Sequence, residues 1–176
     1  VLQNALSRYS SNPSIIPPRI VSSIPSGEAV HLYMPVIDDV YAGVKTLGFN
    51  PNSKLGFVGS INVLEPNTGL LKGVFEAKQV TAIRTALASC IGLNNQLDKF
   101  QNEKVINCTV FGTGLQAFWH IFSCIQLFRE KNDCSEFNIC ILYRSSKMNL
   151  TQFDEMLDDI NLTFNQIPLS DTQSVS

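Results

Sequence analysis

The chain has 176 residues, of which 44% are hydrophobic and 16% charged, and its formal net charge is -2. This balance is typical of a globular protein and excludes a disordered one, which would carry more charge and fewer apolar residues. The basic residues are scattered, so we expect neither nucleic acid nor an anionic membrane as a partner. The length allows one domain or two small ones.

The five cysteines lie mostly in apolar runs, and no pair has Cys-x-x-Cys spacing. We therefore expect reduced, buried thiols in a cytoplasmic protein, rather than a disulfide framework or a zinc site. No stretch reaches the length of a membrane span, so we expect no membrane association either.

The first half of the chain favours strands. Residues 1–14 are polar and suit a helix end and a loop, and residues 17–21 should be extended because proline disfavours helix in the residue before it. Alternating apolar residues predict strands over 28–34, 41–47, 57–64 and 70–76. Turns rich in glycine, proline and asparagine separate them, and Glu-Pro-Asn-Thr-Gly at 65–69 predicts a hairpin turn.

A helix is predicted over residues 78–96. Its apolar stripe is expected to hold five large residues, and small residues beside the stripe should allow close packing: Val80, Ile83, Leu87, Cys90 and Ile91, with Ala82, Ala86 and Ala88. The polar segment 98–104 suggests a domain boundary. We therefore predict two domains, one over 1–102 and one over 103–176.

A glycine-rich turn opens the second domain. An apolar strand over 105–111 leads into Gly-x-Gly-x-x-Ala at 112–117, then into a helix with apolar residues at helical spacing. A second strand over 137–143 completes a βαβ unit, which favours dinucleotide binding over a glycine-bearing loop of another kind. Gly112 would allow the tight turn, Gly114 the approach of a pyrophosphate, and Ala117 the packing of helix on strand. The expected cofactor contacts are Gly112, Thr113, Gly114, Leu115 and Gln116.

After this unit the sequence predicts a helix over 150–157 and a strand over 162–167. A doubly wound dinucleotide domain has about six strands, and about three are present here. We expect the chain to be a fragment of a longer protein; the alternative is a truncated product.

Several motifs occur in a fixed order along the chain: Pro18-Arg19, Met34-Pro35, Gly43-Val44-Lys45, the turn at 65–69, Thr81-Ala82-Ile83-Arg84-Thr85-Ala86, and the glycine turn at 112–117. In this order they resemble the ornithine cyclodeaminase/mu-crystallin family over nearly the whole chain. The resemblance implies an α/β protein: a mixed-sheet substrate-binding domain that builds a homodimer, followed by an incomplete Rossmann domain. It also implies that the catalytic aspartate of the family lies beyond Ser176.

The resemblance also implies a substrate site. Arg19, Lys45 and Arg84 would gather on the carboxylate of a small amino or imino acid, each charge-assisted bond contributing roughly 1.5–3 kcal/mol. Lys45 is also the catalytic candidate, and Arg84 with Thr85 would approach the nicotinamide. Ser60 is a weaker candidate. The alternative is that the three cations are surface residues with their aliphatic stems packed on the core.

The end of the second strand of the βαβ unit separates the two nicotinamide cofactors. An NAD-preferring domain carries an acid there, whereas this chain has Arg144, Ser145 and, further on, Lys147. We therefore favour NADP(H) over NAD(H). The alternative, a capping serine beside solvent-facing cations, suits Ser146 and Lys147 better than Arg144.

Two departures from the family pattern bear on the reaction. Glu76-Ala77 stands where the family often has Asp-Gly, and Leu32 stands where cyclodeaminases carry a glutamate. The first hypothesis is therefore an NADP(H)-dependent reductase of a cyclic imine or related 2-imino acid. The alternatives are an ammonia-releasing, NAD-dependent ornithine cyclodeaminase and a non-catalytic NADPH-dependent binding protein of the mu-crystallin kind.

We expect His31 and His120 to be structural, and Trp119 to be a core or interface residue.

Overall fold

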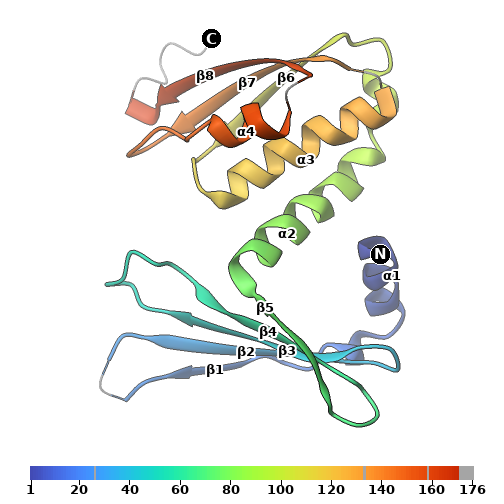
Figure 1. The fold of residues 1–176 in the computed structure, drawn as a ribbon, viewed down its shortest axis with the longest axis vertical. Coiled ribbons are helices and arrows are strands. Elements are labelled where there is room, and N and C mark those ends of the chain that lie inside the picture. Colours follow the sequence, from blue (N-terminus) through green and yellow to red (C-terminus); the bar gives the residue numbers. More distant parts are fainter. Residues whose placement is uncertain (26, 133, 158, 171–176) are drawn as a thin grey trace. The chain divides into compact units, whose positions relative to one another are not determined.

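The computed structural model describes residues 1–170 except 26, 133 and 158 (Figure 1). The chain forms two compact units, Val1–Thr81 and Ala82–Ser176. This division falls inside a long helix, α2 (Ala77–Asn94). The domain boundary after residue 102 stays a prediction.

The first unit is a helix followed by a meander of strands. After α1 (Leu2–Ser11) and the short 3-10 helix η1 (Pro13–Ile15) come β1 (Ile20–Ser23), β2 (Val30–Ile37), β3 (Ala42–Phe49), β4 (Val58–Leu64) and β5 (Leu71–Glu76). The strands pair in chain order, and each described pairing is antiparallel. The four predicted strands are confirmed, with ends within three residues of those expected. The N-terminal helix is longer than the predicted helix end.

The register assigns each strand residue to one of two faces. Lys45 of β3 pairs with Met34 of β2 and Ile61 of β4, and Ile61 pairs with Phe75 of β5. Directly paired residues point to the same side of a sheet, so these four share one face. Ile20, the first residue of β1, pairs with Tyr33 of β2. Arg19 precedes Ile20 and Met34 follows Tyr33, so Arg19 continues the row that contains Met34 and Lys45. We call this side of the sheet the Lys45 face.

Two glycines allow β3 and β4 to approach closely. A Cβ on Gly43 would lie 2.5 Å from the carbonyl oxygen of Asn62, and one on Gly59 would lie 1.8 Å from that of Thr46. Both distances are far too short for any side chain. The glycine of the Gly-Val-Lys motif is therefore required by backbone packing next to Lys45.

The second unit is a βαβαβ arrangement. After η2 (Leu97–Phe100) come β6 (Val105–Phe111), α3 (Leu115–Asn132), β7 (Glu136–Tyr143), α4 (Thr151–Met156) and β8 (Asn161–Pro168). The three strands form a parallel sheet in the order β6-β7-β8. The predicted βαβ unit is confirmed, and the fold is α/β, with three parallel strands joined by helices as in one half of a doubly wound sheet.

Within the second unit, α3 and α4 cover one face of the parallel sheet (Figure 1). The largest fully buried side chains come from both helices and β7: Ile121, Ile125, Phe137, Ile141 and Phe153. Phe118 of α3 contacts Phe153 of α4 at 4.6 Å between ring centroids. Trp119 is partly buried against this core, as predicted.

The predicted stripe of α2 is wrong in part. Val80 and Leu87 are 37% and 44% exposed, whereas Ala82 and Ala86 are 1% and 0% exposed. Ala82 and Ala86 lie one turn apart and form the inner line of the helix, and Val80 lies about 200° around the helix from Ala82. The helix therefore packs through its small residues, and the larger ones lie outside that line.

All five cysteines are free thiols, but only Cys134 is buried and the other four are half-buried, so the expected burial is wrong for most of them. No group of three or more His, Cys, Asp or Glu in the described part of the chain could hold a metal ion. Among the helices that the structure describes, none is both long and apolar enough to cross a membrane.

Candidate functional site

The glycine turn leaves β6 at the carboxyl edge of the parallel sheet. The Gly112 N–H donates to the Leu142 carbonyl oxygen at 2.7 Å, which fixes the turn against the end of β7. Gly112 has a φ of 97°, in the left-handed region where side chains are strained. The chain then reverses into α3, which begins at Leu115.

Open space lies over the start of α3. A Cβ placed on Gly114 would meet no atom within 4 Å. The N–H groups of the first helical turn, from Leu115 onward, have no acceptor within the helix, because the first bond to this turn runs from Phe118 N–H to the Gly114 carbonyl oxygen at 3.1 Å. Free amides, a positive helix end and a space that a side chain would fill suit the diphosphate of a dinucleotide.

The end of β7 brings a cation to the same edge. Phe111 pairs with Leu142 in the parallel register, so Arg144 and Ser145 follow β7 where the glycine turn follows β6. Both residues are exposed, as is Lys147. The predicted cofactor residues of the second unit, from Gly112 to Gln116 and at Arg144 and Ser145, therefore share one edge of the sheet.

Lys45 is fixed by a hydroxyl on α2. Its Nζ donates to Thr81 Oγ1 at 2.6 Å, and the Thr81 hydroxyl itself donates to the Ala77 carbonyl oxygen. Since the hydroxyl hydrogen is already used, the Thr81 oxygen acts as acceptor toward the ammonium. The half-buried Lys45 is thus held at the beginning of α2.

The other predicted substrate residues divide between the units. Arg19 is exposed and belongs to the row of Lys45. Arg84 and Thr85 lie further along α2, in the second unit, where Arg84 is exposed and Thr85 half-buried. Ser60 pairs with Thr46 on the opposite side of the sheet from Lys45, and their hydroxyl oxygens lie 3.3 Å apart. Ser60 therefore does not join the Lys45 face.

A carboxylate caps the helix that carries Thr81. Glu76 accepts bonds from the backbone N–H groups of Gln79 at 2.8 Å and Lys78 at 2.7 Å, which together hold the pKa of its carboxyl below its usual value. This is the capping pattern that satisfies the free amides of a helix start. The cap fixes the position at which α2 leaves β5, and hence the position of Thr81.

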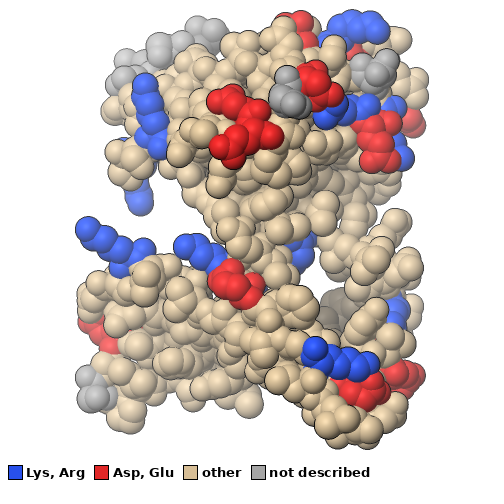
Figure 2. All heavy atoms as spheres, viewed as in Figure 1, with Lys and Arg blue, Asp and Glu red and all other residues tan. Residues whose placement is uncertain are grey.

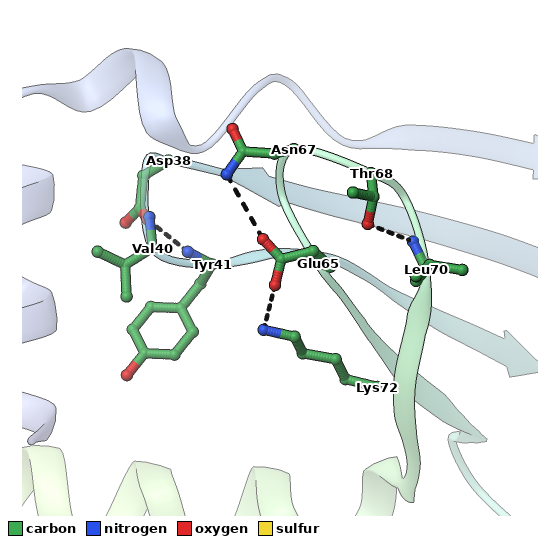
Figure 3. A network of polar contacts seen from close by, with 8 residues as sticks. All are labelled: Asp38, Val40, Tyr41, Glu65, Asn67, Thr68, Leu70 and Lys72. Atoms are coloured by element: carbon green, nitrogen blue, oxygen red, sulfur yellow. Dashed lines mark hydrogen bonds and ion pairs between the residues drawn. The ribbon is translucent and has the colours of Figure 1, made fainter.

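Two turns of the first unit are held by their own polar contacts. In the turn after β2, Asp38 accepts 2.7 Å bonds from the Tyr41 and Val40 N–H groups (Figure 3). These bonds, and an ion pair with Arg8, lower the pKa of the Asp38 carboxyl. In the turn after β4, Glu65 pairs with Lys72, which lowers the pKa of the Glu65 carboxyl. These contacts border a polar cleft of about 670 Å³ beside α1, and Lys45 is not among its lining residues.

Three further side chains of the second unit have partners within that unit. His120 bonds the Gln116 carbonyl oxygen through Nδ1 at 2.7 Å and Ser89 Oγ through Nε2 at 3.1 Å, as befits a structural histidine. A side-chain hydrogen bond between Cys108 and Cys124 lowers the pKa of Cys108 to about 7 and raises that of Cys124.

Figure 2 shows the charged side chains on one face of the molecule. On this face of each unit, lysine and arginine side chains are dispersed and mixed with acidic ones, so the described residues in view form no continuous basic track.

Comparison with known proteins identifies the fold. The sequence profile of the ornithine cyclodeaminase/mu-crystallin family matches residues 1–161. The chain belongs to this family. An uncharacterized protein of Saccharomyces cerevisiae, YGL159W, is 41% identical over 192 residues, covering 98% of this chain and 51% of its own length. The chain thus spans about half the length of this relative.

Two solved structures share the fold. An archaeal alanine dehydrogenase dimer with bound NAD superposes with a TM-score of 0.64 at 19% identity, over 93% of this chain and 49% of that one. A probable ornithine cyclodeaminase from Bordetella pertussis Tohama I gives a TM-score of 0.68 at 13% identity, with the same coverage of both chains. The predicted family and fold class are confirmed.

Sequence reasoning missed two residues of this family member's site. The sequence gives Thr81 no role beyond its place in a motif, and it distinguishes Glu76 only as a departure from the family pattern. An acid directly before a predicted helix is a capping signal that could have identified Glu76. Nothing local indicates the bond from Thr81 to Lys45, because 36 positions separate the two residues.

Proposed function

We propose that the protein is an NADP(H)-dependent oxidoreductase that reduces a small 2-imino acid or cyclic imine. The observation that carries this proposal is the glycine turn: a left-handed Gly112, open space beside Gly114 and free amides at the start of α3. Membership of the ornithine cyclodeaminase/mu-crystallin family supports the same reading.

In this proposal NADP(H) is held by the second unit. Gly112, Thr113, Gly114, Leu115 and Gln116 receive the diphosphate through their backbone, and the exposed Arg144 with Ser145 receives the 2′-phosphate of the adenosine ribose. A phosphate dianion beside a guanidinium forms charge-assisted, often bidentate bonds, which NAD(H) cannot form because it lacks this phosphate.

The substrate carboxylate is held by three cations. Arg19 and Lys45 act from the first unit, and Arg84 acts from α2 with Thr85 beside the nicotinamide. A bound nicotinamide would supply the hydride for the imine carbon, and if the imine binds as the protonated iminium this addition gives the neutral amine without a further proton. The chain's own residues orient the substrate and exclude water, so positioning supplies much of the rate. Lys45, held by Thr81, is the proposed catalytic residue because its ammonium can stabilise charge next to the reacting centre.

We also propose a homodimer built by the first unit. The side of the sheet opposite to the Lys45 face carries five exposed large apolar residues: Ile20, Tyr33, Ile37, Val58 and Val74. Exposed apolar patches of this kind mark protein interfaces. The related archaeal alanine dehydrogenase is a dimer. A cytoplasmic location agrees with five free thiols.

Turnover and binding together test the proposal. NADPH consumption is followed with a panel of cyclic and acyclic 2-imino acids, and cofactor binding is followed separately by fluorescence titration. The proposal predicts NADPH binding and consumption with at least one imine. Ammonia release from ornithine would identify a cyclodeaminase instead, and NADPH binding without turnover on any substrate would identify a binding protein of the mu-crystallin kind.

A further inference from the structure

The strand residues next to Lys45 on its sheet face are all apolar. Along its own row across the sheet, its neighbours are Met34, Ile61 and Phe75, with Arg19 at the end of the row. The two flanking rows contain only aliphatic residues and glycines: Val21, Leu32, Leu47 and Gly59 on one side, and Val36, Gly43, Val63 and Gly73 on the other.

The charges on this face are of one sign. Arg19 and Lys45 are cationic, and no described strand residue on the Lys45 face is acidic. Glu76 pairs with Ser60 on the opposite face, and its carboxylate is already occupied in capping α2. Among the strand residues of this face, a ligand therefore meets the two cations Arg19 and Lys45 and otherwise hydrocarbon, with the Thr81 hydroxyl beside the Lys45 ammonium.

We infer that the substrate side chain is apolar, and that Leu32 and Leu47 select against a cationic one. This inference rests on the proposed function, because it takes the Lys45 face as the substrate site. If the substrate carboxylate binds Arg19 and Lys45, the rest of the substrate lies over one of the two flanking rows. Residues of those rows on the neighbouring strands are diagonal to Lys45, about 7–8 Å away. A terminal ammonium there would lose water without gaining a partner, whereas a methyl group would gain apolar contact.

Substitution of Leu32 gives the most direct test of this selection against a cationic side chain. It is half-buried in the middle of β2 and pairs directly with Leu47, in the row next to Lys45. A carboxylate placed at position 32 would give a terminal ammonium an acceptor within the site. His31 provides the control, because it is exposed, adjacent in sequence and on the opposite face.

Norvaline and ornithine form a matched pair of ligands, since both carry a three-carbon side chain and only ornithine ends in an ammonium. NADPH binding is measured first, and each amino acid is then titrated into the NADP⁺-saturated protein by calorimetry. We expect norvaline to bind at least tenfold more tightly than ornithine. We expect Leu32→Glu to reverse this order and His31→Glu to leave it unchanged.

Each outcome decides a separate point. Failure of NADPH to bind would contradict the proposed function itself. With NADPH bound, ornithine affinity equal to or above that of norvaline in the unmodified protein would overturn the inference, whether or not Leu32→Glu folds. Failure of both amino acids to bind would also overturn it. Equal shifts in Leu32→Glu and His31→Glu would assign the effect to overall charge and would overturn the role of Leu32.

Discussion

Lys45 and Thr81 are joined by a 2.6 Å hydrogen bond that ties the middle of β3 to the first turn of α2. The Thr81 hydroxyl donates to the Ala77 carbonyl oxygen, so its own oxygen accepts from the ammonium. The strand cation of the Gly-Val-Lys motif and the threonine that opens the Thr-x-x-Arg-Thr motif therefore form one structural element.

Removing the Thr81 hydroxyl should release the Lys45 amine. In Thr81→Val the shape of the side chain is kept but the acceptor is lost, and a bond to a charged group is worth about 1.5 kcal/mol or more. We expect acetic anhydride to label Lys45 about three- to tenfold faster, measured by peptide mass spectrometry. Thr81→Ser retains a hydroxyl and should label as slowly as the unmodified protein. Equal rates in all three proteins would show that the bond does not restrain Lys45.

We expect Gly112 to matter for stability because of its backbone conformation, and not because a side chain there would collide with a neighbouring atom. Its φ of 97° strains any residue with a Cβ, so Gly112→Ala should destabilise the second unit by about 1–2 kcal/mol. The measurement is urea unfolding followed by fluorescence of the single tryptophan, Trp119. Gly92→Ala is the control, because a Cβ at this exposed helix position also meets nothing within 4 Å. A loss no larger in Gly112→Ala than in Gly92→Ala would contradict the strained turn.

Arg144→Ala should change the cofactor preference. Loss of the guanidinium removes the partner of the 2′-phosphate, so NADPH affinity should fall about tenfold while NADH affinity stays the same. Fluorescence titration with both cofactors measures this change. Lys147→Ala removes the same charge from a nearby exposed position and should have a smaller effect. If NADPH and NADH affinities fall together in Arg144→Ala, the residue does not read the 2′-phosphate.

The α2 cap should make the stability of the first unit depend on pH. The pKa of Glu76 is lowered in the folded protein by two backbone N–H groups, so its contribution is present above the ordinary value of 4.5 and is lost as pH falls through the folded pKa. Glu76→Gln should therefore lower the melting temperature by a few degrees at neutral pH and by progressively less in acid. Glu155→Gln, with the same charge change at an exposed site, should show no such trend. A constant difference at all pH values would contradict the cap.

Much of the fold follows from local patterns. Alternation of apolar residues located β2 to β5, and the change to helical spacing after Gly112 located α3, because these signals depend only on neighbouring residues. The length of the N-terminal helix α1 was underestimated because polar residues dominate this segment and none of the helix residues is buried. The buried alanine line of α2 was misjudged because burial depends on what the helix packs against, which periodicity alone does not encode.

Only those residues of the candidate site that belong to recognisable sequence motifs could be predicted. The glycine turn and Arg144 follow from their places after two consecutive strands. The Lys45–Thr81 bond and the apolar rows around Lys45 depend on strand register and on a contact across 36 positions, neither of which a single sequence states. A one-residue shift in register would have moved Leu32 to the opposite face.

Calorimetric titration of NADPH into the unmodified protein and into Gly114→Ala tests the central claim most directly. The space beside Gly114 is open, so the added methyl group should leave the melting temperature unchanged. It should weaken NADPH binding at least tenfold, because it occupies the position at which the diphosphate approaches the backbone. Absence of NADPH binding to the unmodified protein, or equal affinity in Gly114→Ala, would contradict nucleotide binding at the glycine turn.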